Sequence, residues 1–422
     1  MFCTPLCVNG DCGALQNNAD KRKYKKMKQN RKVAIASYWD SMSNYGQVLQ
    51  GVALQYVLRK LGYEPFTIRY NMTEEKPYSK SLSNRIYELI HDDLSFMEHV
   101  KRRFKFLHDK YSNIPSEKPN YKQRGFNDFR KEYLQMSLNQ YNRFNELDNS
   151  ELAECYALIT GSDQVWTAAS GSERRKYLLL EFARQGQKRI SYAASFGRDS
   201  IIFPKEQEEY KKELAQFDAL SVREESGVQL CKKMDIDAIC VLDPTLLLTR
   251  DEWLSYMKLS NERNANKKKK VFVYTLKVDH DLVNKIMQYL VNLGYECDYV
   301  CSDDRTIDPK ATLEATPRQW IESVATTDLV VTTSFHGTIF ALNFNIPVIS
   351  IGKDGLLTVN QNQRMYSIMN KLGLLEFFIN KYDENHLHNI LNTRIDWKYI
   401  NEILSAERNK SIRFLKSALN CY

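Results

Sequence analysis

His336 is the side chain that the sequence places best for proton transfer. It follows the apolar run DLVVTTS (328–334), and Gly337 permits a tight turn at the start of a helix. In a parallel sheet such a turn lies at the carboxyl end of a strand, where ligands bind. A lone histidine is more often structural, but only seven occur in this chain, and imidazole titrates near neutral pH. We therefore predict a working cleft around the turn formed by Ser334, Phe335, His336 and Gly337.

Two earlier strand-to-helix turns also carry polar residues. In the first, Asn44, Gly46 and Gln47 open a helix after a strand that ends at Ser37. Glycine lets a ligand approach the backbone, and a helix N-terminus offers free N–H groups, although tight turns need glycine in any case.

The second of these turns is ALITGSDQVW (157–166). Ser162 or Asp163 could be a helix cap, but a cap does not require Gln164 and Trp166 beside it. We interpret the four residues as a polar site with an aromatic wall.

Arg223 and Asp243 stand at the ends of two further predicted strands. Arg223 could bind a phosphate or carboxylate with paired donors, or form a surface ion pair with Glu224 or Glu225; the residues favour neither. Asp243 precedes Pro244, so a structural turn is the favoured role. Orientation of an arginine or histidine by this carboxylate is the alternative.

Short β-branched and aromatic runs alternate with helical patterns in two series. The first series lies at 33–37, 66–70, 156–161, 189–195, 219–223 and 238–243, and the second at 271–277, 297–303, 328–334 and 346–352. Such alternation is typical of βαβ units and a parallel sheet. The predicted fold class is α/β, with two Rossmann-like doubly wound domains that face a cleft.

A polar, Asn- and Lys-rich stretch separates the two series, so we place a linker near 249–270. A chain of 422 residues also exceeds the roughly 250 to 300 that one core supports. The expected domains are 32–255 and 268–380, followed by closing helices at 384–420. Charged and aromatic residues with helical spacing at about 72–150 indicate an insertion packed on the first domain. A membrane-surface helix around 96–107 is the alternative.

The net charge of +8 comes largely from eight Lys or Arg residues between Lys21 and Lys32. We expect residues 1–31 to form a disordered basic tail, with attraction to anionic lipid as its functional alternative. Nucleic acid is a weaker partner because no recognised nucleic-acid module accompanies the charge. No apolar run approaches the roughly 20 residues that span a bilayer.

Cysteine usage indicates a cytoplasmic protein with reduced thiols. The nine cysteines are an odd number scattered along the chain, and the first 30 residues hold no apolar segment of signal-peptide length. Cys3, Cys7 and Cys12 could bind zinc, but their spacing matches no closed four-ligand set, so no metal is expected. The motifs of Walker NTPases, nicotinamide dehydrogenases, zinc proteases and α/β-hydrolases are absent.

Seven motifs, taken in order, resemble the polysaccharide pyruvyl transferase family. They are NYGQVLQGVAL, ITGSDQVW, ISYAASFG, SVREESG, LDPTLLL, TSFHGTIFAL and NIPVISIG, and the likeness spans roughly Val33 to Leu375. The resemblance implies a fold like that of two-domain GT-B glycosyltransferases, with the site between the domains. It further implies phosphoenolpyruvate as the donor substrate, no separate cofactor, and two sugar hydroxyls as the acceptor of a cyclic pyruvate ketal.

The resemblance also implies roles for three residues. Arg223 matches an arginine expected to contact the donor, and His336 matches a histidine expected to act as an acid or to bind phosphate. Arg364, nine positions before Gly373, stands where the family usually has lysine, so the charge is kept. Asp163 is the second catalytic candidate.

One position departs from the family pattern, because Ser334 stands where many members have arginine. Arg364, Lys353 or Arg198 could supply the missing charge. Alternatively, the chain could belong to a branch with a different acceptor or reaction.

Two other functions stay open at this point. A nucleotide-sugar glycosyltransferase of the same shape should carry a carboxylate placed for a ribose, yet only Asp354 is acidic between Asn343 and Arg364. A catalytically silent carbohydrate-binding protein is the other. The acceptor expected from the resemblance is a bacterial capsule or exopolysaccharide precursor, such as a hexose ketalated at O4 and O6, with or without a lipid carrier. The chain would then work in the cytoplasm or at the inner face of the membrane.

Overall fold

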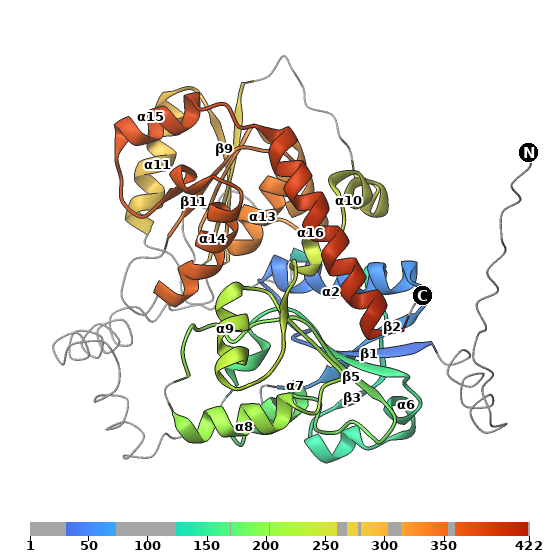
Figure 1. The fold of residues 1–422 in the computed structure, drawn as a ribbon. Coiled ribbons are helices and arrows are strands. Elements are labelled where there is room, and N and C mark those ends of the chain that lie inside the picture. The colour runs from blue at the N-terminus through green and yellow to red at the C-terminus, as the bar shows by residue number, and fades with distance from the viewer. Residues whose placement is uncertain are drawn as a thin grey trace, which may run out of the picture.

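The computed structural model describes residues 31–72, 124–168, 170–201, 203–259, 268–276, 280–302, 314–352 and 359–420. Within them the chain forms two parallel β-sheets with helices packed around them (Figure 1). The two Rossmann-like α/β domains predicted from the sequence are therefore confirmed.

The first sheet has seven strands in the order β3-β2-β1-β4-β5-β6-β7, and all neighbouring pairs are parallel. Its central strands are buried along almost their whole length, as expected for a sheet covered on both faces. The strands are β1 (Lys32–Ala36), β2 (Glu64–Tyr70), β3 (Met136–Tyr141), β4 (Ala157–Thr160), β5 (Lys188–Ala194), β6 (Ala219–Val222) and β7 (Ile239–Cys240).

The second sheet has five parallel strands in the order β12-β11-β10-β8-β9. Its middle strand β10 leads into the turn that holds His336. The strands are β8 (Lys270–Thr275), β9 (Glu296–Cys301), β10 (Leu329–Thr332), β11 (Val348–Ile351) and β12 (Phe378–Ile379).

Helices connect the strands of both sheets. Those before the second sheet are α2 (Tyr45–Lys60), α5 (Phe126–Tyr133), α6 (Ser150–Ala153), α7 (Glu173–Leu178), α8 (Pro204–Leu214), α9 (Glu225–Lys233) and α10 (Arg250–Met257). Those after it begins are α11 (His280–Asn292), α12 (Pro317–Thr326), α13 (Phe335–Asn343), α14 (Val359–Lys371), α15 (Glu384–Asn392) and α16 (Trp397–Ala418). Short 3₁₀ turns are η2 (Phe144–Leu147), η3 (Val165–Thr167), η4 (Pro244–Leu246) and η6 (Leu375–Phe377).

One apolar core runs from the first domain into the second. The ring of Tyr45, in the first turn of α2, stacks on Trp320 of α12 at 5.6 Å, and its hydroxyl donates to the carbonyl of Ala315 at 2.6 Å. Trp253 of α10 packs against Phe340 of α13 with ring centroids 5.3 Å apart. A second core covers the opposite face of the first sheet. Shared packing therefore fixes how the two domains sit relative to each other.

The last helix, α16, returns from the second domain to the first (Figure 1). The hydroxyl of Ser411 accepts a hydrogen bond from the backbone of Leu242 at 3.0 Å, and Lys188 donates to the carbonyl of Ala418 at 2.9 Å. Helices α15 and α16 lie within the segment 384–420, and α16 ties the domains together.

Two segments differ from the sequence expectation. The described part of 72–150 contains an edge strand, β3, as well as helices. The sequence of β3, MSLNQY, is largely polar because only part of an edge strand is buried. The expected strand at 238–243 pairs only over Ile239–Cys240, because Pro244 opens η4 soon afterwards. The expected tail and membrane-surface helix fall on residues outside the described ranges.

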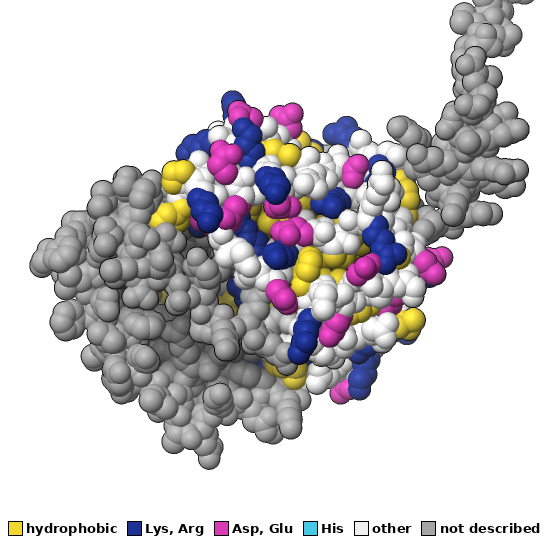
Figure 2. All heavy atoms as spheres, turned by 90° about the horizontal axis from the view of Figure 1, so that it is seen from below, with side chains coloured by type: hydrophobic (Ala, Val, Ile, Leu, Met, Phe, Trp, Pro, Cys, Tyr) yellow, Lys and Arg dark blue, Asp and Glu magenta, His cyan; other side chains and the backbone are white. Residues whose placement is uncertain are grey.

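The described face of the first domain seen from below mixes basic and acidic side chains with scattered apolar ones (Figure 2). None of the described helices is both long and apolar enough to span a membrane.

Candidate active site

The candidate site lies where the carboxyl ends of the two sheets meet. Asp163 follows β4, Arg223 follows β6 and Asp243 follows β7, while His336 follows β10 of the other sheet. Because all these strands are parallel within their sheets, their carboxyl ends gather the side chains in one place.

Asp243 is the centre of a hydrogen-bonded network and is completely buried. Its Oδ2 accepts from Ser162 Oγ at 3.0 Å and from Arg223 Nη1 at 3.1 Å, and lies 3.6 Å from His336 Nε2. Its Oδ1 accepts from the backbone N–H and the hydroxyl of Thr245. Burial alone would raise the pKa of Asp243, but His336, Arg223 and these hydrogen bonds lower it far below its usual range.

Asp163 faces the same arginines from the β4 turn. Its φ of 82° is unusual for a residue with a side chain and places the carboxylate toward the cleft. Gln47 Nε2 donates to Oδ2 at 3.1 Å, and Oδ1 lies 3.6 Å from Arg223 Nη2 and 4.0 Å from Arg364 Nη1. Burial opposes ionisation, yet Arg223, His336 and Arg364 lower the pKa of Asp163, so it stays charged.

Arg223 and Arg364 both lie against the ring of Phe335. Their guanidinium carbons are 4.9 Å and 5.8 Å from the ring centroid, within the range of cation–π contact. Burial would lower the pKa of Arg223, but Asp243, Glu224 and Asp163 raise it. Burial, and then repulsion by Arg223, lower the pKa of Arg364 to about 10, so both arginines carry charge at neutral pH.

His336 is packed between the two domains. A Cβ on Gly46, in the first turn of α2, would lie only 2.0 Å from His336 Nδ1, so no other residue fits at position 46 without moving the ring. Gly337 is equally constrained, because a Cβ there would lie 2.4 Å from Thr332 Oγ1. The glycines at these two turns are therefore required for close approach and not for a positive φ.

Two polar residues predicted for the site are helix caps. Asn44 Oδ1 accepts from the backbone of Gln47 at 3.2 Å at the start of α2, and Ser334 Oγ accepts from the backbone of Gly337 at 3.4 Å at the start of α13. Both helices direct their N-termini, the positive end of the helix dipole, toward the cleft.

Several buried polar atoms of this cluster have no hydrogen-bond partner among the described residues. They are Arg223 Nε and Nη2, Arg364 Nε, His336 Nε2 and Glu224 Oε2. A cavity of about 280 Å³ is lined by Arg223, Glu224, Asp243, Phe335 and Arg364, among others. His336 and Asp163 are not among its lining residues and adjoin it through Asp243 and Arg223. Since native proteins pair nearly all buried polar groups, these atoms point to a ligand.

The family can now be assigned from comparison with known proteins. The family model described as polysaccharide pyruvyl transferase matches residues 44–355, most of the chain. The chain belongs to the polysaccharide pyruvyl transferase family. The match covers every element of the site from Asn44 to Gly337, while Arg364 lies beyond it.

Solved structures of low similarity are found as well. A Streptomyces sp. SF2575 glycosyltransferase complexed with thymidine diphosphate is 13% identical, with a TM-score of 0.40, over 92% of this chain and 99% of that one. A Neisseria meningitidis UDP-GlcNAc 2-epimerase bound to UDP-GlcNAc is 8% identical, with a TM-score of 0.46, over 93% and 100%. A search of the curated proteins finds no significant match.

Trp166 and Gln164 do not join the cluster that contains the other predicted residues. Trp166 is buried in the core on the far face of the first sheet, where it packs on Phe196 at 4.9 Å, so it forms no aromatic wall of the cleft. The Gln164 side chain lies against Gly197. The backbone carbonyl of Gln164 accepts a hydrogen bond from the Tyr38 hydroxyl. The sequence of a motif does not show toward which side of a short turn each of its side chains points.

Two proposed substitutes for the family arginine at Ser334 can also be placed. Arg198 forms an ion pair with Glu206 of α8 instead of a contact with the cluster. Lys353 lies outside the described residues. Arg364 is thus the substitute that the described structure places beside Arg223.

Sequence reasoning placed Phe335 in the His336 turn and named Glu224 as a possible ion-pair partner of Arg223, but it gave neither a role in the site, and it favoured a structural turn for Asp243. Asp243 does cap η4, but it also holds Arg223 and lies beside His336, so both of its alternatives apply. Phe335 and Glu224 are adjacent in the sequence to His336 and Arg223, and this adjacency was the sequence feature that could have identified them as site residues.

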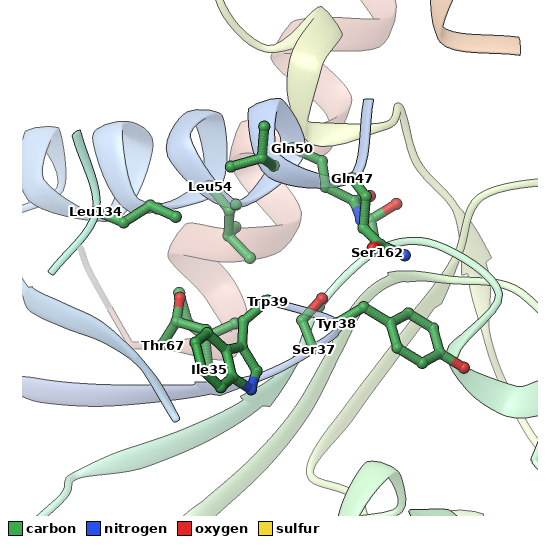
Figure 3. A pocket seen from close by; sticks show the side chains of 13 residues that line it. Ile35, Ser37, Tyr38, Trp39, Gln47, Gln50, Leu54, Thr67, Leu134 and Ser162 are labelled. Atoms are coloured by element: carbon green, nitrogen blue, oxygen red, sulfur yellow. The ribbon is translucent and has the colours of Figure 1, made fainter. Parts of the chain in front are cut away.

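A second, smaller cavity lies under α2. It is lined by Gln47, Gln50 and Ser162, among other residues, and Gln50 has no hydrogen-bond partner among the described residues (Figure 3). Its volume of about 10 Å³ is too small for a sugar or a phosphate ester. The larger cavity beside the arginines is therefore the candidate substrate site. No group of three or more His, Cys, Asp or Glu residues in the described ranges is arranged to hold a metal ion.

Proposed function

We propose that this chain transfers pyruvate from phosphoenolpyruvate to two hydroxyls of a sugar, forming a cyclic ketal and releasing phosphate. The acceptor is a precursor of a bacterial surface polysaccharide, on a lipid carrier or in polymeric form. The family assignment supports the pyruvyl transfer, and the donor rests on the chemistry of the cleft.

The observation that supports this donor is a set of buried nitrogens at the domain boundary without a hydrogen bond to any described residue, although carboxylates lie 3.6 Å from three of them, Arg223 Nε, Arg223 Nη2 and His336 Nε2. Arg223 has two such nitrogens, Arg364 has one, and His336 Nε2 is also without a partner among the described residues. Each unsatisfied buried group costs roughly 1 to 3 kcal/mol, more when it is charged. Phosphoenolpyruvate carries a phosphate and a carboxylate close together, whose oxygens would accept from these donors.

Net charge alone would not select this donor. Asp163, Asp243 and Glu224 offset the charges of Arg223, Arg364 and a protonated His336, so binding depends on directed hydrogen bonds. The N-terminus of α13 adds backbone N–H groups that favour an anion. Ser334 supplies no charge, so Arg364 provides the positive charge that many family members have at position 334.

In the proposed reaction His336 donates a proton to the methylene carbon of phosphoenolpyruvate, which makes C2 electrophilic. A sugar hydroxyl bonds to C2 and releases its proton to Asp163. The C2–O bond to phosphate then breaks, and the second hydroxyl closes the ketal at the same carbon. The proton held by Asp163 passes to the departing phosphate, and the proton of the second hydroxyl restores His336, so both residues return to their starting states.

Asp243 has a supporting part in this reaction. Its carboxylate holds Arg223 at 3.1 Å and lies 3.6 Å from His336, so it stabilises the imidazolium before proton transfer. Asp163 is kept ionised by both arginines, which makes it a weak base but a good acceptor for a sugar hydroxyl. The arginines also stabilise the charge that develops on the leaving phosphate.

The direct experiment is incubation with phosphoenolpyruvate and a panel of lipid-linked mono- and disaccharides. We expect a pyruvate ketal on one acceptor, detected by mass, with an equal amount of released phosphate. The His388→Ala variant, altered on the exposed surface of α15, is the matched control and should behave like wild type. Transfer from a nucleotide sugar instead, or sugar binding without any phosphate release, would overturn the proposal.

A further inference from the structure

The cavity beside the arginines is also lined by residues that the proposed donor contacts do not use. These residues come from α9, α14 and α16, which lie near one another at the domain boundary (Figure 1). The cavity volume of about 280 Å³ is near the lower end of the roughly 300 to 1,000 Å³ typical of small-molecule sites. Arg223 is buried and Arg364 half-buried, whereas Asn370 and Lys371 are exposed, so we call the arginine side the inner end of the cavity and the Lys371 side its outer end.

The outer half presents neutral hydrogen-bonding groups above an apolar floor. Arg364, Ser367 and Lys371 are spaced by three and four residues, so they share one face of α14. Asn370 stands beside them at the exposed mouth. Leu246 and Ile368 are apolar residues of the cavity lining. Hydroxyls and amides over an apolar surface match a sugar ring, which has hydroxyl edges and C–H faces.

The charges in the outer half argue against a second phosphate there. Lys371 Nζ is already bonded to Glu407 at 2.6 Å, and Glu225 adds another negative charge. Among the described residues, Phe335 is the only aromatic one that lines the cavity, and both guanidinium groups lie against it. In the outer half, the described cation Lys371 is held by Glu407, so a second phosphate there would lack a free cation, whereas an uncharged polyol needs none.

We propose that the outer half of this cavity binds the acceptor saccharide, with Ser367 and Asn370 as specificity-determining contacts. The sugar's hydroxyl pair then faces the arginine end, where the donor lies, and its C–H face rests on Leu246 and Ile368. Glu407, held by Lys371, accepts a hydrogen bond from a further hydroxyl. This inference rests on the proposed function for its donor but makes a separate prediction about sugar binding.

The test uses the full chain, with p-nitrophenyl glycosides of galactose, glucose and mannose as soluble probes. Ser367→Ala and Asn370→Ala should each weaken binding of the preferred glycoside about 2- to 12-fold, as expected for one lost hydrogen bond. Titration calorimetry without phosphoenolpyruvate gives the affinity, and initial rates give the KM of each substrate. Asn389→Ala, the same substitution on the exposed face of α15, is the matched control.

We expect the KM for the glycoside to rise while the KM for phosphoenolpyruvate and the kcat stay within two-fold of wild type. If wild type transfers pyruvate but neither variant changes glycoside binding, the inference is wrong and the proposed function stands. If wild type binds a glycoside through these residues without transferring pyruvate, the proposed function is wrong and the subsite stands. Failure of wild type to bind any of the three glycosides would also overturn the subsite.

Discussion

Buried arginines occupy two places at the domain boundary, and their surroundings differ. Arg124 enters the second domain at the end of β9, where its guanidinium donates to Ser302 Oγ at 2.9 Å, to the carbonyl of Cys301 at 2.8 Å and to Glu314. Arg223 and Arg364, at the other place, have nitrogens without a hydrogen bond among the described residues, although Arg223 Nη2 and Nε lie 3.6 Å from Asp163 and Glu224. An arginine held by hydrogen bonds joins the domains, whereas one that retains hydrogen-bonding capacity is available to a ligand.

The aromatic residues reinforce this contrast. Around Arg124, Tyr45 stacks on Trp320 and contacts Tyr274, so apolar packing fills the boundary. Around Arg223 and Arg364 only Phe335 intervenes, and a cavity opens beside them. We expect substitutions in the first region to change stability and those in the second to change binding and turnover.

The largest effect is expected from His336→Ala. A positioned acid or base typically contributes about 10² to 10⁴-fold to the rate, so kcat should fall by that factor. The protein should remain folded, because Asp243 keeps its bonds to Arg223, Ser162 and Thr245. Steady-state kinetics beside a thermal unfolding curve checks both statements; activity within a few-fold of wild type would remove His336 from the mechanism.

The next largest effect is expected at Arg223 and Arg364. Replacing Arg223 or Arg364 by alanine should weaken phosphoenolpyruvate binding by about 1.5 to 3 kcal/mol, the contribution of hydrogen bonds to charged groups. Lysine should restore more at position 364 than at 223. Arg364 makes one ion pair, at 4.0 Å, whereas Arg223 spreads its nitrogens over Asp163, Glu224 and Asp243, which a point charge cannot imitate.

The measurement for this pair is the dissociation constant of phosphoenolpyruvate for all four variants, with Arg394→Ala on the exposed surface as the control. Equal recovery by lysine at both positions would contradict the distinction between the two arginines.

A smaller effect of the opposite kind is expected from Arg124→Leu. It leaves buried acceptors on Ser302 and Cys301 without their donor, so the free energy of unfolding should fall by about 1 to 3 kcal/mol. Chemical denaturation measures this loss, and the KM for phosphoenolpyruvate should change little in the protein that remains folded. Unchanged stability together with a large rise in KM would assign Arg124 to the substrate site instead.

The smallest effect is expected from deleting residues 1–30, which belong to neither region. Their basic run should attract the protein to anionic membranes, with about 1 kcal/mol per charge near the surface and a range of about 10 Å at 0.1 M salt. Activity on a lipid-linked acceptor in anionic vesicles should therefore fall several-fold at low salt and not at high salt. Activity on a soluble glycoside should stay the same; equal loss on both acceptors would exclude a membrane role for this segment.

The sequence was sufficient to predict the fold because its strands are continuous apolar runs and its helices are amphipathic between them. The same rule explains why β3 was missed: an edge strand buries little, so MSLNQY carries no apolar pattern. The return of α16 to the first domain could not be predicted either, because its contacts with Leu242 and Lys188 join residues far apart in the chain.

For the site, the sequence could identify the turns but not the side-chain directions within them. Ser162 and Asp163 reach the cluster, whereas Trp166, three residues later, enters the core on the far face of the sheet. The proximity of Asp243 to His336 is a contact between domains that no local pattern encodes. Only the folded chain shows which nitrogens of Arg223 and Arg364 are left without a hydrogen bond among the described residues.

The central claim is that Arg223 and Arg364, which have buried nitrogens without a hydrogen bond in the described part of the chain, bind phosphoenolpyruvate, whereas the hydrogen-bonded Arg124 does not. Titration calorimetry of phosphoenolpyruvate into wild type, Arg364→Leu and Arg124→Leu tests it most directly, with folding of each protein checked in the same buffer. We predict that Arg364→Leu loses affinity roughly 10- to 150-fold while its stability is unchanged, and that Arg124→Leu keeps the wild-type affinity. Wild-type affinity in Arg364→Leu, or an equal loss in both variants, would contradict the account.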